Sequence, residues 1–153
     1  MTHNQYIKLF NDIGDVHEYI NTFGNGDIEK YTNNEDTSKY GQTLWVNVLP
    51  KTINETTQNK DYVIWVMDFV NEDFSNEDEV LSDTERTFDD IVAILRSDYY
   101  NDFFIIEQIS KPEPFVERYG TRVAGWTSTI TFKEKFENDV CQAVISEIPT
   151  ITI

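Results

Sequence analysis

Apolar residues recur at helical spacing near the start of the chain, in steps of four, three, four and three residues. They are Leu9, Ile13, Val16, Ile20 and Phe23. This periodicity predicts a helix over residues 6–23. Gly14 lies inside the pattern and favours a bend or break, because glycine costs about 1 kcal/mol relative to alanine in a helix. The glycines of Phe23-Gly24-Asn25-Gly26-Asp27 predict the helix end, and the polar residues 30–42 a loop.

Two apolar runs that follow predict strands. Residues 44–49 read Leu-Trp-Val-Asn-Val-Leu and stop at Pro50, and residues 61–70 come after a polar stretch. Within 62–70, apolar residues occupy both the even-numbered and the odd-numbered positions. That pattern is typical of a central strand covered on both faces, or of a strand with one face covered and the other at a subunit contact.

A central amphipathic helix follows the acidic connection 71–79. Ser82 with Glu85 three residues later matches a capping box, which predicts the helix start at this point. The expected buried face has helical spacing and consists of Phe88, Ile91, Val92 and Leu95. The helix is expected to end between residues 97 and 100.

The rest of the pattern is typical of a sheet. Residues 103–109 and 123–133 each predict a strand, and the prolines in 111–114 interrupt pairing because proline lacks a ladder donor. One face of the 123–133 strand is expected to carry Ala124, Trp126, Ser128, Ile130 and Phe132. Residues 140–148 predict a last strand or a short helix. The tail 149–153 is expected to add as a strand to its own sheet or to a neighbour's edge.

This order of elements predicts one α+β domain over residues 1–153. It contains an N-terminal helix, a mixed or antiparallel β-sheet and a central amphipathic helix. The hydrophobic fraction is 39% and the aromatic fraction 14%, and buried aromatic rings compensate for the small number of leucines. The single cysteine, Cys141, excludes an internal disulfide and a multi-cysteine zinc site, and is interpreted as a small buried apolar residue.

Charge limits the classes of partner. The chain has 28 acidic and 12 basic side chains and a net charge of −16. Nucleic-acid binders need clustered Lys and Arg, so direct binding of DNA or of an anionic membrane is not expected. The first residues lack the basic and apolar regions of a signal peptide, and no apolar run approaches the roughly 20 residues of a membrane span. A soluble protein of a reducing cytoplasm is therefore expected.

The sequence shows no recognisable motif for metal binding, nucleotide binding or catalysis. His3 and His17 have no acidic partner at metal-ligand spacing, and a calcium loop aligned on Asp73 has Asp78 where the turn needs glycine. Gly24-Asn25-Gly26 lacks the third glycine and the preceding strand of a dinucleotide-binding loop. No nucleophile has a base beside it in a known pattern, and 28 acids make carboxylate pairs uninformative. We therefore expect no enzyme, no cofactor and no metal.

Two passages resemble small virion proteins of tailed phages and prophages of Bacteroidetes-type hosts, including crAss-like phages. The first runs from Val16 to Asp27 and contains His17-x-x-Ile20-x-x-Phe23-x-x-Gly26. The second runs from Arg118 to Trp126 and ends in the strand opening Arg122-Val123-Ala124-Gly125-Trp126. The resemblance covers most of the chain and implies a head–tail connector, ring or tail-terminator-like component with no catalytic residues.

What the resemblance implies is an α+β subunit that closes into a homo-oligomeric ring, a hexamer or dodecamer, around the DNA channel of the virion. Its other partners would be portal-side and tail-side proteins, and it would be made in the bacterial host cytoplasm. Ring closure uses heterologous contacts, so one subunit must present two different surfaces. The residues expected at these contacts are Glu72, Asp73, Glu77, Asp78, Glu79, Tyr119, Arg122, Trp126, Ile151 and Ile153.

Acidic side chains that line a channel would keep DNA from sticking. The hypothesis is that the connection 71–79, or Asp12, Asp15 and Glu18, faces the lumen or a basic neighbouring ring. The alternative function is an acidic DNA-mimicking inhibitor of a host nuclease. It is favoured by ten acids between Asp68 and Asp90 against the single base Arg86. The apolar residues that break this acidic stretch are Phe69, Val70, Phe74, Val80 and Leu81.

Overall fold

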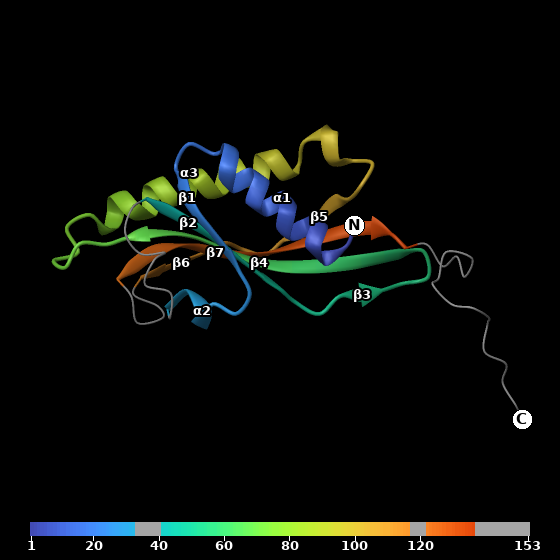
Figure 1. The fold of residues 1–153 in the computed structure, drawn as a ribbon, viewed down its shortest axis with the longest axis horizontal. Coiled ribbons are helices and arrows are strands. Elements are labelled where there is room, and N and C mark those ends of the chain that lie inside the picture. Colours follow the sequence, from blue (N-terminus) through green and yellow to red (C-terminus); the bar gives the residue numbers. More distant parts are fainter. Residues whose placement is uncertain (33–40, 117–121, 137–153) are drawn as a thin grey trace, which may run out of the picture.

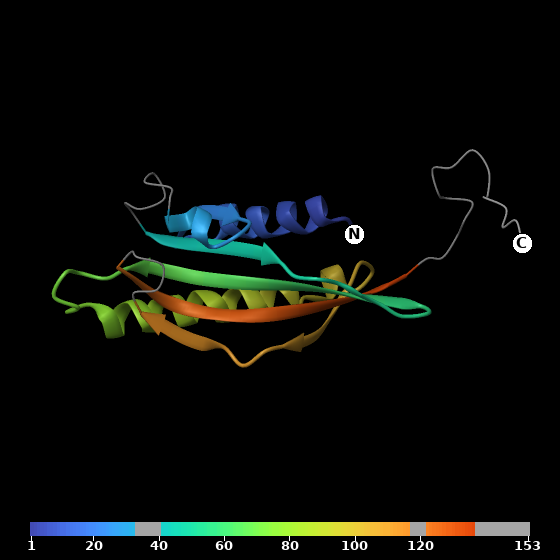
Figure 2. The same ribbon diagram turned by 90° about the horizontal axis from the view of Figure 1, so that it is seen from below.

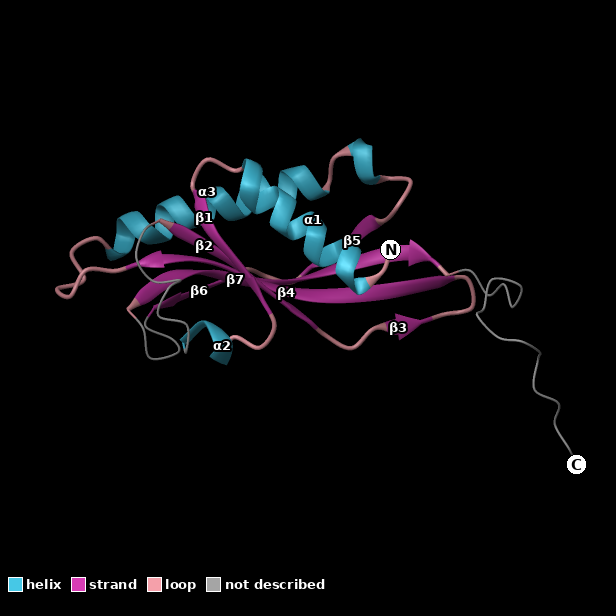
Figure 3. Ribbon diagram, in the orientation of Figure 1, coloured by secondary structure: helices cyan, strands magenta, loops and turns pink. Residues whose placement is uncertain are grey.

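A twisted sheet of seven strands forms the middle of the structure, a computed structural model that describes residues 1–32, 41–116 and 122–136 (Figure 1). Two helices, α1 and α3, cover one face of the sheet, and the short helix α2 lies on the other (Figures 1 and 3). The strand order is β1-β2-β4-β7-β5, with β3 beside β4 and β6 beside β7. This is the expected α+β domain, and its sheet is mixed because β1 and β2 are parallel.

The elements follow one another along the chain as α1 (His3–Val16), β1 (Ile20–Asn25), α2 (Glu29–Thr32), β2 (Gln42–Val48), β3 (Thr52–Ile53), β4 (Thr57–Phe69), α3 (Glu77–Leu95), the 3-10 helix η2 (Asp98–Tyr100), β5 (Ile105–Ile109), β6 (Glu113–Val116) and β7 (Val123–Lys135).

The first helix is shorter than its periodicity predicts. A capping box of Thr2 and Gln5 starts α1, and the helix runs through Gly14 without a break and ends at Val16. Residues 20–25 form the strand β1 instead, so the prediction of helix there was wrong. The reason is that Ile20 and Phe23 pack back against α1 from the sheet, each within 4 Å of the point where a Gly14 side chain would begin.

The central strand β4 is covered on both faces, which is the first of the two arrangements that its pattern allows. Its even-numbered side chains Tyr62, Ile64 and Val66 pack under α1 and α3, whereas Trp65 and Met67 join a second cluster with Trp45 on the opposite face. β4 pairs antiparallel with β2 on one side and β7 on the other. Figure 2, seen from below, shows β2, β4 and β7 side by side with α3 behind them. Both predicted strands, 44–49 and 61–70, are confirmed within β2 and β4.

The central helix starts earlier than the capping-box motif predicts. α3 begins at Glu77 behind Asn76, so Ser82 lies inside the helix and the predicted start was wrong. Three acids in the first turn suit the positive end of the helix dipole, and Val80 is already buried. The predicted face is confirmed for Phe88, Ile91 and Leu95, which are buried in the core.

The last described strand, β7, organises one edge of the sheet. β5 and β6 both pair with it and are separated by residues 110–112. The interruption predicted at 111–114 is confirmed for Lys111 and Pro112 but was wrong for Glu113 and Pro114, which pair with β7 because β6 is an edge strand that tolerates proline. The even-numbered residues of β7 face the helices as predicted, and Ile130 and Phe132 are fully buried. Tyr119, the segment 137–153 with Cys141, Ile151 and Ile153, and most of the predicted loop 30–42 lie outside the described residues. Among the described helices, none is long and apolar enough to cross a bilayer.

Candidate functional site

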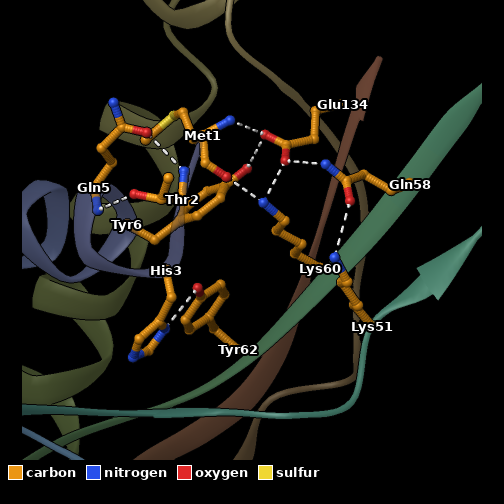
Figure 4. A network of polar contacts seen from close by, with 10 residues as sticks. All are labelled: Met1, Thr2, His3, Gln5, Tyr6, Lys51, Gln58, Lys60, Tyr62 and Glu134. Atoms are coloured by element: carbon orange, nitrogen blue, oxygen red, sulfur yellow. Dashed lines mark hydrogen bonds and ion pairs between the residues drawn. The ribbon is translucent and has the colours of Figure 1, made fainter. Parts of the chain in front are cut away.

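A buried carboxylate joins the first helix to the two longest strands. The side chain of Glu134, near the end of β7, is 3% exposed. Its Oε2 accepts from the amino group of Met1 at 2.9 Å and from the Tyr6 hydroxyl at 3.0 Å. Its Oε1 pairs with the Lys60 ammonium at 2.6 Å and accepts from the Gln58 amide at 2.8 Å. Figure 4 shows the Met1 amino group, the Tyr6 hydroxyl of α1 and the Gln58 and Lys60 side chains of β4 converging on the Glu134 carboxylate of β7.

The two cations control the ionisation of this carboxyl group. Burial alone would raise the pKa of Glu134, but the hydrogen bonds and charges of Lys60 and of the Met1 amino group outweigh burial and hold that pKa below its ordinary value. Lys60 also donates to the Met1 carbonyl. The carboxylate is therefore ionised and compensated at neutral pH, which a buried charge requires.

Two tyrosines beside the carboxylate stay protonated at neutral pH. Burial, and then the negative charge of Glu134, raises the pKa of Tyr62 to about 12 and that of Tyr6 above its usual range. The rings of Tyr6 and Tyr62 lie 5.1 Å apart, and the His3 ring stacks on Tyr62 with its Nδ1 3.1 Å from the Tyr62 hydroxyl. The phenols act here as hydrogen-bonding members of the aromatic core.

Each oxygen of Glu134 already has two partners, so this group is committed to holding the chain together and has little capacity left to accept a substrate proton. Sequence reasoning missed the network. A signal was present, because Glu134 continues the buried alternation of Ile130 and Phe132, and Lys60 continues that of Tyr62 and Ile64 on the paired strand. A charge on the buried face of each of two neighbouring strands indicates an ion pair.

The opposite end of the sheet carries the acidic residues that the sequence singles out. Glu72 and Asp73 are exposed in the connection from β4, and Glu77, Asp78 and Glu79 form the first turn of α3. The structure brings Glu72 together with Arg122, whose Nη2 lies 3.2 Å from the Glu72 Oε1. Both side chains are solvent-exposed, and an exposed pair of this kind contributes little stability.

The acidic connection itself has a defined shape. The Asp73 Oδ1 accepts from the Ser75 N–H at 3.1 Å, and bonds from the Ser75 side chain and backbone hold the pKa of Asp73 below its ordinary value. Phe74 is 40% exposed and has a φ of 59°, a left-handed conformation that is uncommon for a large side chain. A short turn thus presents Phe74 among carboxylates at one end of the molecule.

Burial raises the pKa of Asp68, the last acid of β4, although its Oδ1 accepts from the Phe69 N–H at 2.7 Å. The nearby charge of Asp83 on α3 acts in the same direction. This end of the sheet therefore concentrates negative charge from β4, the connection and α3.

Trp126 has a role within the fold. Its half-buried indole donates to the Leu81 carbonyl at 2.9 Å and so ties β7 to the first turns of α3. The neighbouring Gly125 lies against β4 so closely that a Cβ would be 1.9 Å from the Val66 carbonyl oxygen. The Ala-Gly-Trp opening of this strand thus has a local structural reason, and a contact between Trp126 and a neighbouring copy stays a prediction.

Two other residues that the sequence singled out, His17 and Asp12, make polar contacts within the subunit. His17, at the end of α1, lies 3.0 Å from the Asp90 carboxylate on α3. Asp12 pairs with Lys8 one turn earlier on the same helix. Within residues 1–32, 41–116 and 122–136, no three His, Cys, Asp or Glu side chains gather as a metal site. Comparison of the chain with protein-family models and with curated proteins finds no match.

Proposed function

We propose that this protein is a structural subunit of a phage virion, in which copies form a multimeric ring at the head–tail interface. The observation that supports this proposal most strongly is the pair of unlike edges of the sheet. In the described part of the chain the sheet ends at β1 on one side and at β5 and β6 on the other. A subunit with two unlike edges can associate head to tail, and such heterologous contacts close into rings.

The distribution of charge supports the same function. Acids concentrate at the end formed by the connection and the start of α3, where Arg122 and Arg86 are the basic side chains among the described residues. A surface of this kind repels phosphates, so DNA would pass without sticking. In the proposed ring this end faces the channel or a basic neighbouring ring, while Glu134 and its partners stiffen the other end of the subunit.

Mass spectrometry of purified virions tests the proposal. We expect this polypeptide in virions of the phage whose genome encodes it, at a copy number far below that of the major capsid protein. We expect native mass spectrometry to find hexamers or dodecamers, either of the purified chain or after addition of the portal protein. Absence of the polypeptide from complete virions contradicts the proposal.

A pair of variants makes the test specific for the sheet edge. Ile105 is 51% exposed on the edge strand β5. Thr131 is half-buried on the inner strand β7, where it pairs with Asp61 of β4 on one side and with Gln108 of β5 on the other. A charged side chain at an edge blocks pairing with another copy. Ile105→Lys is therefore expected to fold and fail to assemble, whereas Thr131→Lys is expected to assemble. Equal assembly by both variants argues against a contact at this edge.

A second candidate function, imitation of DNA, is favoured by the exposed side of α3. Its solvent-exposed carboxylates are Asp78, Glu79, Asp83, Glu85, Asp89 and Asp90. The apolar Val80 and Phe88 that interrupt them in sequence point into the core, so they do not break the acidic surface. A DNA mimic competes with duplex DNA for a nuclease. Inhibition of a host nuclease at a one-to-one ratio, with no incorporation into virions, would favour this candidate over the ring.

A further inference from the structure

A groove of about 470 Å³ runs between α1 and the connection from α3 to β5. Polar side chains lie at its rim, among them Lys8 and Asp12. Its apolar lining consists of Leu9, Ile13, Val16, Ile94, Tyr99 and Phe103. The floor is the buried core residue Ile13, so the groove opens directly onto the main core beneath α1.

The side chains around this groove are exposed to an extent that is unusual for their type. Val16 is 76% exposed, Tyr99 78% and Phe103 56%. Tyr99 is anchored, because its ring packs edge-on against Tyr100 and Tyr100 stacks on the buried Phe104. A contiguous exposed apolar patch rimmed by polar groups is typical of an interaction site.

The end of β7 lies beside this groove. A second hollow of about 760 Å³ shares Met1 and Phe103 with it and is also lined by Lys133 and Lys135. The Phe136 N–H donates to the Thr56 carbonyl, so the last described residue is held beside the turn that precedes β4. Residues 137–153 follow it in the sequence, and a segment of that length could reach on the order of 50 Å at about 3.3 Å per extended residue.

The sequence of this C-terminal segment matches the groove in chemistry. Its large aliphatic side chains are Val140, Val144, Ile145, Ile148, Ile151 and Ile153. Its three charged side chains are the acids Glu137, Asp139 and Glu147. The adjoining hollow has mixed charge, because Asp102 and Glu134 line it together with Lys133 and Lys135, and Lys133 pairs with Glu107 at 3.1 Å. The match between segment and groove is therefore one of apolar side chains with an apolar lining.

We propose that residues 137–153 of a neighbouring copy bind in the groove between α1 and the α3–β5 connection. The inference rests on the proposed homo-oligomer and adds a second contact between its subunits. Groove and segment are two different surfaces of one subunit, so the exchange is a head-to-tail contact that closes into a ring. Val140, Val144 and Ile145, which flank Cys141 in the sequence, would then be the side chains that fill the groove.

The single cysteine of the chain, Cys141, lies in this segment and allows a direct test with the full-length protein. A disulfide forms where two Cα atoms come within about 7 Å. We therefore expect Val16→Cys and Tyr99→Cys to form interchain disulfides with Cys141 under mild oxidation, visible as dimers and longer ladders on a non-reducing gel. Both positions are exposed, so folding should be unaffected.

Ile53→Cys is the matched control. Ile53 is 51% exposed and lies on the β3–β4 hairpin, which Phe136 contacts through Thr56, but outside the groove. An undocked segment would reach it at least as easily. Interchain crosslinking at Val16 or Tyr99 at least about tenfold faster than at Ile53 supports the proposal, since tenfold corresponds to a clear binding preference. Equal rates, or intrachain disulfides at the groove, overturn it.

Two further measurements separate this inference from the proposed function. Phe103→Asp in the Tyr99→Cys background should lower the crosslinking rate by about tenfold, because it removes apolar contact area from the groove. Native mass spectrometry of the reduced wild-type chain reports the ring independently. Rings without crosslinking at the groove overturn the exchange of the segment alone, and absence of the chain from virions overturns the ring.

Discussion

Glu134 accepts from groups on both α1 and β4, so its replacement tests how strongly one residue joins these elements. Glu134→Gln leaves the Lys60 ammonium without a counter-charge at 13% exposure. Breaking a buried ion pair by removing one partner costs about 3 kcal/mol or more. We expect a loss of that size in the free energy of unfolding, measured by urea denaturation at neutral pH.

Glu107→Gln is the control for this prediction. Glu107 pairs with Lys133 at 3.1 Å, but both side chains are more than one-third exposed. Pairs of this kind contribute about 0.5 kcal/mol. A loss for Glu134→Gln no larger than that for Glu107→Gln would mean that the buried pair does not stabilise the fold.

The pH dependence of stability follows from the same carboxyl group. Its pKa is lowered in the folded state, so its contribution is complete above the unfolded-state pKa of about 4.3 and is lost as the pH falls through the folded-state pKa. The difference in unfolding free energy between wild type and Glu134→Gln should thus be constant from pH 7 to about pH 5 and shrink below that. Denaturation series from pH 3 to pH 7 measure it, and a difference that grows on acidification contradicts the assignment.

The acidic residues of the connection could be identified from sequence, whereas the Glu134 network was missed. Local patterns indicate exposed charge because the acids gather within one short polar stretch, residues 71–79, where five of the nine side chains are acidic. Glu134 and Lys60 are 74 positions apart, and their pairing depends on the register of β4 with β7, which no local window contains. Alternation still indicated that both belong to the buried face.

At the level of elements, Gly14 shows that a glycine within a helical pattern need not bend or break the helix. The helix continues through it, and a Cβ would lie 3.5 Å from Ile20 Cγ2 and 3.7 Å from Phe23 Cβ, which are ordinary contacts. Gly14→Ala is therefore expected to stabilise the protein by about 0.5–1 kcal/mol, through helix propensity and the less flexible unfolded chain. Thermal and urea unfolding measure the change.

Gly24→Ala is the comparison. Gly24 lies in β1 against the Trp45 ring, and an added Cβ would be 2.1 Å from Trp45 Cζ3. The indole would have to move, which is expected to cost about 1–3 kcal/mol. If Gly14→Ala destabilises the protein as much as Gly24→Ala, then β1 packs on α1 more tightly than the distances of 3.5 and 3.7 Å at Gly14 indicate.

The two wrong element boundaries have the same physical origin. Val16, Ile20 and Phe23 continue the helical spacing, but Val16 points into solvent and the other two pack from β1. A strand that packs on a helix can place apolar residues at intervals that resemble a helical stripe. Ser82 and Glu85 likewise match a capping motif, but both lie inside α3. The buried face of this helix already includes Val80, before Ser82, and continues with Thr84.

Trp126 connects two elements, which separates its role in folding from any role in assembly. Trp126→Phe keeps most of the ring contact but removes the bond from the indole to the Leu81 carbonyl. The expected loss is about 1 kcal/mol of unfolding free energy. If Trp126 acts within the subunit alone, the variant forms the same oligomers as wild type in native mass spectrometry. Loss of assembly with unchanged stability would instead place the indole at a subunit contact.

At the scale of the whole molecule, the high negative net charge of each copy opposes the association of copies. Each copy carries −16, so copies brought into a ring repel one another unless ions screen them. The groove between α1 and the α3–β5 connection is mainly apolar, and apolar contacts do not weaken at moderate ionic strength. If it is the main contact, salt should remove the repulsion and leave the attraction in place.

We therefore expect association of the purified chain to strengthen as ionic strength rises from about 0.01 M to about 0.15 M, because the Debye length falls from roughly 30 Å to roughly 8 Å over that range. Sedimentation velocity at fixed protein concentration measures the shift from subunits to oligomers. Tyr99→Asp, in the groove, should remove the oligomer at every salt concentration, whereas Glu72→Gln, at an exposed acid, should promote assembly at low salt. Association that weakens on adding salt would mean that ion pairs, and not the apolar groove, hold the copies together.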